Sequence, residues 1–265
     1  MVNKYFDTGW VKPITPVTNQ IDANATDAPM ADRDIVWDWT AVDIPKGTHK
    51  LVNASIHMQG EDGARRADID FQVWFAKPID GVEPPSLGTP NAVVTGTGHR
   101  KHMLGSITLD STQSIGDLDP FNNFMSTGIV SSNGLLNPDA TLVVNGEKML
   151  AVDDSYSSSD TPEGYHRIYV AGITMGAVDF STGVLTTEAV SASASAVDIT
   201  VDGVDARKVF EVGDIIQAMD LAEIGTITSI PDATSVLVDA VEDALANNDE
   251  ILTTSPCKFK LAFEQ

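Results

Sequence analysis

The chain has 265 residues, and 42% of them are hydrophobic, which is enough to bury the core of one large or two smaller domains. Its formal net charge of −22, from 38 acidic and 16 basic residues, argues against binding to nucleic acid or to an anionic membrane surface. The single cysteine, Cys257, excludes an intramolecular disulfide and is expected to be a buried structural thiol. The N-terminus lacks the apolar run of a signal peptide, and no stretch has the roughly 20 apolar residues of a membrane span. We therefore expect a protein made in the cytoplasm, with no membrane partner.

Residues 1–34 show no sustained helix or strand periodicity and contain three prolines, so we predict an extended N-terminal arm. Tyr5, Phe6 and Trp10 stand at the front of this arm, which is unusual for a disordered tail. Because aromatic residues dominate binding hot spots, the three are interface candidates. We expect them to dock either on the core of the same chain or on a neighbouring subunit, and the sequence leaves both open.

The strongest strand pattern lies in residues 67–76, where every second position from Ile69 to Phe75 is apolar. Residues 52–58 repeat this alternation, and a loop with Gly60 and Gly63 separates the two segments. A period of two indicates half-buried strands, because successive side chains point to opposite faces of a sheet. We predict that the two form an antiparallel pair, which begins the core of a β-sandwich or jelly-roll-like main domain over residues 35–190.

Residues 77–90 are rich in Pro and Gly and form a predicted loop, and Asn145-Gly146 predicts a tight hairpin within residues 141–152. The run of Ser and Ala at 191–196 is the best boundary candidate. About six short strands follow it at regular spacing, which predicts a small C-terminal β-barrel domain over residues 191–265. Only residues 240–247 could form a helix. The fold class predicted from the sequence is therefore all-β.

The only concentrated basic segment is His99-Arg100-Lys101-His102. Two histidines three positions apart can ligate a metal, but no further ligand follows at a suitable spacing, and the adjacent cations oppose metal binding. We expect instead a solvated or interface-facing loop that contacts an acidic partner. Acidic residues in segments 117–122 and 153–160 lack the ligand spacing of a calcium hand and are assigned to loop solvation, although calcium binding there stays open.

No nucleophile elbow, phosphate-binding loop or dinucleotide fingerprint occurs in the sequence. Carboxylate pairs are so abundant that choosing two of them for glycoside hydrolysis would be arbitrary. We therefore expect no enzymatic activity, no catalytic residue, no bound metal and no cofactor.

One set of segments consists of residues 43–48 (DIPKGT), 75–81 (FAKPIDG) and 84–89 (PPSLGT). This set resembles segments of virion structural proteins of tailed bacteriophages. The second set looks like a small β-barrel module of phage head proteins and consists of residues 209–216 (VFEVGDII), 225–230 (GTITSI) and 245–251 (LANNDEI). In the last turn of this module the family usually has Gly where this chain has Asn248, which still tolerates a positive φ angle.

Among these proteins, the capsid decoration (cement) proteins are the most similar in being all-β and poor in cysteine. The resemblance implies a virion protein on the capsid surface, which binds the major capsid protein and forms a homo-oligomer, a dimer or a trimer. A tail, collar or fibre protein is the alternative within the same class. A carbohydrate-binding or depolymerase module is the alternative from a different class, and it requires an exposed Trp or Tyr in a groove together with convergent carboxylates.

Overall fold

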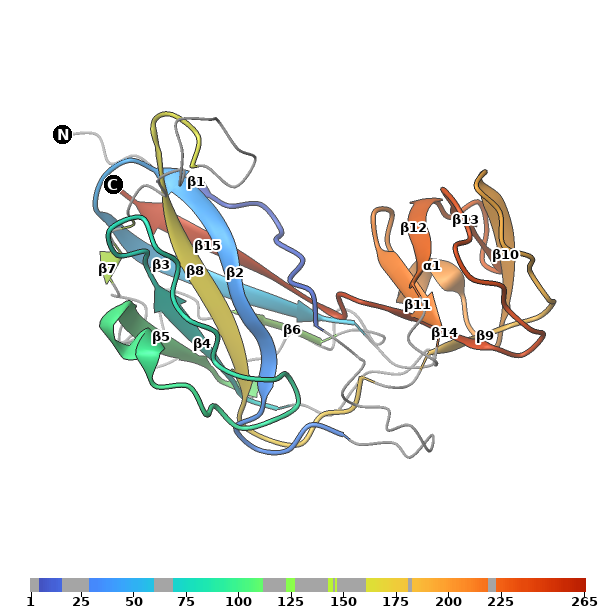
Figure 1. The fold of residues 1–265 in the computed structure, drawn as a ribbon, viewed down its shortest axis with the longest axis horizontal. Helices are drawn as coiled ribbons and strands as arrows, with labels where there is room; N and C mark the ends of the chain where they lie inside the picture. The colour runs from blue at the N-terminus through green and yellow to red at the C-terminus, as the bar shows by residue number, and fades with distance from the viewer. Residues whose placement is uncertain are drawn as a thin grey trace.

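The fold is all-β, as predicted, and consists of a two-sheet sandwich with a closed β-barrel at one end (Figure 1). The computed structural model describes residues 5–15, 29–59, 69–111, 123–126, 143–144, 146, 161–180, 183–218 and 223–265. The jelly-roll-like connectivity of the main domain stays a prediction.

One sheet of the sandwich contains the N-terminal and C-terminal strands of the described chain. Its strand order is β1-β15-β3-β6, and β7 also pairs with β3. The strands are β1 (Tyr5–Asp7), β15 (Cys257–Glu264), β3 (His49–Met58), β6 (Asn123–Ser126) and β7 (Val143–Val144). The pairing of β15 with β3 covers the whole of β15, so the C-terminal strand lies between the N-terminal strand and the rest of this sheet.

The second sheet has the order β2-β8-β4-β5, and all its neighbouring strands are antiparallel. Its strands are β2 (Ile35–Pro45), β8 (Tyr165–Thr174), β4 (Phe71–Ala76) and β5 (Met103–Leu109). The short 3₁₀ helix η2 (Gly98–Lys101) leads directly into β5. Residues 77–90, which the Pro and Gly content predicted to be a loop, contain no named helix or strand.

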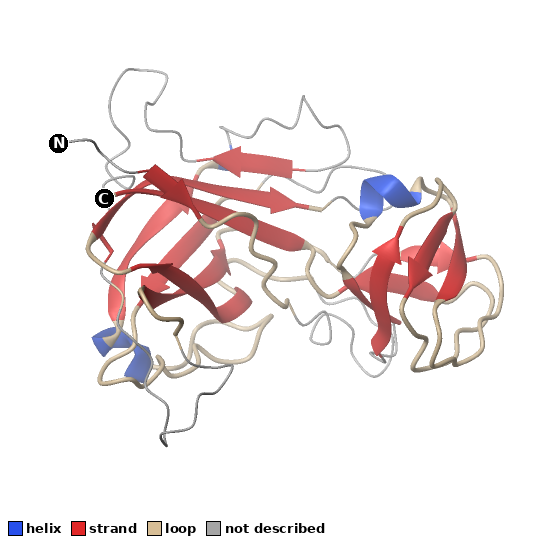
Figure 2. Ribbon diagram, turned by 90° about the horizontal axis from the view of Figure 1, so that it is seen from above, coloured by secondary structure: helices blue, strands red, loops and turns tan. Residues whose placement is uncertain are grey.

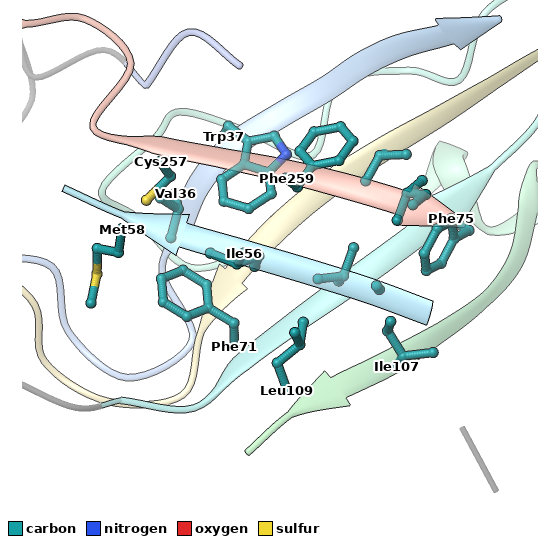
Figure 3. Packing of buried hydrophobic residues seen from close by; sticks show 14 of the residues in the cluster. Val36, Trp37, Ile56, Met58, Phe71, Phe75, Ile107, Leu109, Cys257 and Phe259 are labelled. Atoms are coloured by element: carbon teal, nitrogen blue, oxygen red, sulfur yellow. The ribbon is translucent and has the colours of Figure 1, made fainter. Parts of the chain in front are cut away.

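The core lies between the two sheets and includes the fully buried Trp37 (Figure 3). The indole ring of Trp37 stacks on Phe259 of one sheet, with ring centroids 5.8 Å apart, and on Phe71 of the other, at 6.3 Å. Gly172 of β8 makes room for this ring, because a Cβ atom there would lie 2.4 Å from it. Apolar residues of both sheets therefore pack on the ring of Trp37, and only glycine leaves enough room for this ring at position 172.

The two strands predicted to pair as a hairpin do not pair with each other. β3 belongs to the first sheet, β4 belongs to the second, and Ile56 and Phe71 meet across the core between them (Figure 3). Alternation shows which face of a strand is buried but not which strand is its neighbour. The prediction of two core strands was right, and the prediction of their pairing was wrong.

The remaining strands form a separate barrel (Figure 2). It closes through six antiparallel pairings in the order β10-β13-β12-β11-β14-β9. Its strands are β9 (Val184–Thr186), β10 (Val197–Asp202), β11 (Ile215–Ala218), β12 (Glu223–Ser229), β13 (Ser235–Val238) and β14 (Glu250–Thr253). It has its own apolar core, in which Ile199, Val236 and Ile251 are fully buried. Closure leaves no unpaired sheet edge on this module.

The barrel boundaries differ from residues 191–265 at both ends. β9 precedes the predicted boundary, and β15 leaves the barrel to pair with β3 of the sandwich.

Residues 240–247, the predicted helix candidate, contain no helix. The short helix α1 (Ala206–Val209) is a single turn, and the side chain of its N-cap residue, Asp205, accepts a hydrogen bond from the Arg207 amide. Asn248 has a φ angle of 65°, the positive value that the turn was expected to require.

Candidate interaction surfaces

The N-terminal segment lies along β15 of the same chain. β1 pairs with β15, and the amides of Thr8, Val11 and Thr15 donate to carbonyls of Leu261, Phe259 and Thr254. Residues 5–15 therefore form the edge of the sandwich, and within the described residues β15 is the only strand that pairs with β1.

The aromatic residues of β1 point in different directions. Phe6 packs on the core of its own chain, where its ring stacks on Phe263 at 5.2 Å and meets the edge of His49 at 5.0 Å. Tyr5 is 67% exposed, and its hydroxyl donates to Glu264 at 3.3 Å. Of the two alternatives left open by the sequence, Phe6 thus follows the first, whereas the side chain of Tyr5 is largely exposed to solvent.

Trp10 lies on the outer face of the same sheet and is 40% exposed. The ammonium groups of Lys258 and Lys260 each lie 5.3 Å from its ring centroid, and His57 meets it edge-on at 6.3 Å. A cation over an exposed aromatic face contributes roughly 0.5–1 kcal/mol. Trp10 therefore has a defined position while part of its surface stays open.

Three segments that are distant in sequence meet at a group of ion pairs between the sandwich and the barrel. Lys12 Nζ lies 2.6 Å from Asp214 Oδ1 and 3.3 Å from Glu211 Oε2. Lys258 of β15 also donates to Glu211. Asp214, whose side chain is only 4% exposed, accepts a further hydrogen bond from the Glu211 amide at 2.8 Å. These contacts hold the turn before β11 against both the N-terminal segment and the C-terminal strand.

Two opposing effects set the pKa values of Lys12, Glu211 and Asp214: burial disfavours the charged form of each side chain, and the nearby opposite charges favour it. Burial disfavours charged Lys12, but Asp214 and Glu211 outweigh it and raise the pKa of Lys12 above its ordinary value. Burial raises the pKa of Asp214 by more than Lys12 lowers it. Burial also opposes ionisation of Glu211, yet Lys258 and Lys12 together hold the pKa of Glu211 below its usual range. Lys12 and Glu211 are therefore charged at neutral pH.

A cavity of about 240 Å³ lies beside these ion pairs. Its lining comes from the N-terminal segment, β3, α1, the turn before β11 and the start of β15. The charged and polar lining residues are Lys12, His57, Gln59, Arg207, Lys208, Glu211, Asp214, Ser255 and Lys258. Cationic side chains outnumber carboxylates in this lining, which is the reverse of the composition of the whole chain.

Two of the four residues in the predicted basic loop at 99–102 are buried, although the whole loop was expected to face solvent or a partner. His99 is buried and packs beside Trp39 and Trp74, with ring centroids 6.4 Å and 5.8 Å away. His102 is also buried, and its Nδ1 donates to the Lys77 carbonyl at 2.9 Å.

Burial lowers the pKa of His99, and nearby Arg100 lowers it further. Only Arg100 and Lys101 of this segment are exposed to solvent. The loop therefore presents two cations rather than four basic residues.

A second, less polar groove of about 510 Å³ lies on the outer face of the sheet that contains β4 and β8. Trp74 and Gln72 project into it from β4, and the Trp74 Nε1 donates to the Gln72 Oε1 at 2.7 Å. Its other lining residues are Arg33, Val93, Val94, Ile173 and Met175. The hydrogen bond fixes both polar side chains at the wall of the groove.

The predicted acidic segments at 117–122 and 153–160 lie outside the described residues, as does most of the predicted hairpin at 141–152. Within the described part of the chain, no three His, Cys, Asp or Glu side chains gather as metal ligands would. No helix in that part has the length and apolarity needed to cross a membrane. Cys257 is fully buried in the sandwich core, as expected.

Sequence analysis missed the junction residues Lys12, Arg207, Lys208, Glu211, Asp214 and Lys258. Only the alternation of β15 gave a signal, because Lys258 and Lys260 stand on either side of buried Phe259 and therefore share the opposite face of the strand. That pattern identifies a cationic face. It does not reveal that the N-terminal segment and the barrel lie against it.

No protein-family model matches this chain, and none of the curated proteins is significantly similar to it in sequence.

Proposed function

We propose that this chain is a non-enzymatic structural protein of a tailed-phage virion, which binds the outside of the capsid and stabilises it. The motifs at 209–216, 225–230 and 245–251 support this class of protein, and the all-β fold with a separate closed barrel agrees with it. The proposal includes the major capsid protein as partner and a homo-oligomer, a dimer or a trimer, on the capsid surface. Nucleic acid and membrane are not among the proposed partners.

The observation that carries the proposal is the aromatic sheet edge formed by residues 5–15. An edge strand can accept a strand from another chain, and exposed aromatic side chains beside it supply anchors. Tyr5 and Trp10 are exposed along this edge, whereas Phe6 and the backbone hydrogen bonds fasten it to β15. An edge with a fixed position and open aromatic surface suits attachment to an ordered shell, because little conformational freedom is lost on binding.

The test is binding of the purified protein to capsids assembled without it, measured by co-sedimentation. Deleting residues 1–20 would also remove β1 and the ion pairs of Lys12, so a deletion would confuse binding with folding. The double variant Tyr5→Ala/Trp10→Ala removes the exposed aromatic surface and keeps the backbone pairing. We expect this variant to retain its β-type circular dichroism and to bind capsids at least about tenfold more weakly. Unchanged capsid binding would contradict the proposal.

One observation favours carbohydrate binding as a second candidate, namely the groove beside Trp74. Its volume lies within the roughly 300–1,000 Å³ typical of ligand pockets, and it combines an aromatic ring with the amide of Gln72. A glycan array probed with the protein and with Trp74→Ala separates the two candidates. Binding of a glycan that is lost in Trp74→Ala would favour the carbohydrate reading, and the absence of glycan binding would remove it.

A further inference from the structure

We propose that the cavity at the junction of the N-terminal segment, β15 and the barrel binds carboxylate side chains of an acidic peptide segment from a partner protein. This inference does not depend on the partner being a capsid protein. It rests on three features of the junction: an excess of positive charge, a small volume and an aromatic surface that adjoins it.

The first feature is the local charge. Four cationic side chains line the cavity, Lys12, Arg207, Lys208 and Lys258, against the carboxylates of Glu211 and Asp214. Asp205 pairs with Arg207 at 2.9 Å, but Lys260 extends the cationic face along β15. The junction thus gathers five of the 16 Lys and Arg residues in a chain that carries 38 acidic residues.

Lys12, Lys258 and Arg207 keep N–H donors beyond those that their present carboxylate partners accept, because an ammonium has three N–H donors and a guanidinium has five. Glu211 is shared between Lys12 and Lys258, while Asp214 is almost fully buried and also accepts the Glu211 amide. Arg207 pairs with Asp205 and lines the cavity from α1 together with Lys208, whereas Lys258 lines it from β15. A carboxylate placed between these walls would accept charge-assisted hydrogen bonds, which are the stronger class of hydrogen bond in proteins.

The second and third features select the kind of ligand. At about 240 Å³ the cavity is smaller than the roughly 300–1,000 Å³ of typical ligand pockets, so it suits a side chain or a small anion. Trp10 lies over Lys258 and Lys260 next to it and offers an apolar surface, which a free ion would not use. The net charge of −22 repels a long polyanion such as nucleic acid. A short acidic peptide meets all three conditions.

The test uses the full-length protein and isothermal titration calorimetry with a hexaglutamate peptide, with its hexaglutamine analogue and with inorganic phosphate. We expect the glutamate peptide to bind at low ionic strength, to weaken as salt is added, and to bind more tightly than the other two ligands. In NMR spectra of the unaltered protein, the glutamate peptide should shift the backbone amides of residues 207–211, 255, 257 and 258. Equal binding of both peptides, tighter binding of phosphate or shifts confined to other segments would each overturn the proposal.

The chain contains a matched control, because the Arg-Lys pair of α1 recurs as exposed Arg100-Lys101. Arg207→Glu/Lys208→Glu and Arg100→Glu/Lys101→Glu change the net charge equally. We expect the first double variant to weaken glutamate-peptide binding by about tenfold and the second to change it by less than about twofold. Equal weakening by both would mean that only the overall charge matters, and the proposed site would be wrong.

Discussion

Lys12 and Asp214 form an ion pair of 2.6 Å although 202 residues separate them in the chain. Lys12 belongs to the segment that borders the sandwich, and Asp214 belongs to the turn that precedes barrel strand β11. Glu211 reinforces this link by accepting from Lys12 and from Lys258. The orientation of the barrel therefore depends on charges that both chain ends supply.

Replacing Lys12 with Met should destabilise the barrel. The substitution keeps the side-chain length but leaves the buried carboxylate of Asp214 without its cation, which typically costs about 1–3 kcal/mol. Urea unfolding followed by far-ultraviolet circular dichroism measures the loss. Lys101→Met, which removes an exposed cation elsewhere, is the control and should change stability by less than about 0.5 kcal/mol.

The double variant Lys12→Met/Asp214→Asn tests the cause of that loss. Because it removes the unpaired buried charge, it should recover part of the stability lost in Lys12→Met. If the double variant is less stable than the unaltered protein by the sum of the losses measured for Lys12→Met and for Asp214→Asn alone, the two residues do not interact energetically.

Replacing Gly172 with Ala should disrupt the sandwich core. The new methyl group would lie 2.4 Å from the ring of Trp37, and overpacking of this kind costs typically about 1–3 kcal/mol. Differential scanning calorimetry should show a lower melting temperature for the sandwich. Adding Trp37→Phe to this variant should reduce the penalty of the alanine, and an unchanged penalty would show that the ring is not the cause.

Stability should fall in mildly acidic solution because of His99. Its folded-state pKa is lowered from the ordinary 6.5, first by burial and then by Arg100, so the unfolded chain binds the proton more tightly. The neutral ring thus gives full stability above about pH 7, and stability falls as the pH drops through about 6.5 towards the folded-state pKa. Urea unfolding at about pH 8 and about pH 5.5 measures the difference.

The variant His99→Leu should show a smaller loss of stability between these two pH values, because the titrating group is gone. Other titrating groups are the same in both proteins, so the comparison isolates His99. An identical loss in the variant would contradict a role for this buried ring.

Alanine variants of Phe6 and Tyr5 should affect different properties, namely folding stability for Phe6 and partner binding for Tyr5. Phe6→Ala removes a ring that packs on Phe263 and His49 and should cost about 2–3 kcal/mol, less than the roughly 3–5 kcal/mol of a fully buried Phe. Tyr5→Ala changes an exposed side chain and should alter stability by less than about 0.5 kcal/mol. Chemical denaturation of both variants, beside capsid co-sedimentation, distinguishes the two roles. A large loss of stability in Tyr5→Ala would contradict this division.

Local patterns in the sequence predicted strands well. Phe259, Leu261 and Phe263 occupy every second position of β15, and all three lie in the core of the sandwich. The same patterns could not assign partners to the strands. β3 and β4 follow each other closely in sequence, yet they lie in opposite sheets, because pairing depends on contacts made by distant strands such as β15 and β8.

The candidate interaction surfaces could be predicted from the sequence only in part. His99 stands beside Arg100 and Lys101, so it resembled part of a basic loop until the structure placed Trp39 and Trp74 next to it. The Lys12–Asp214 pair has no local signature at all, because its partners come from different modules. Tyr5 and Trp10 could be named as interface candidates from composition, but their separation from Phe6 required the pairing of β1 with β15.

The most direct measurement is cryo-electron microscopy of the particle that contains this protein. The account predicts density for a sandwich and a barrel on the outer capsid surface, at a copy number set by the shell, with residues 5–15 at a contact to the major capsid protein. Density confined to the tail, collar or fibres would contradict decoration and favour the alternative within the same class. Absence of the protein from the particle would contradict a structural role altogether.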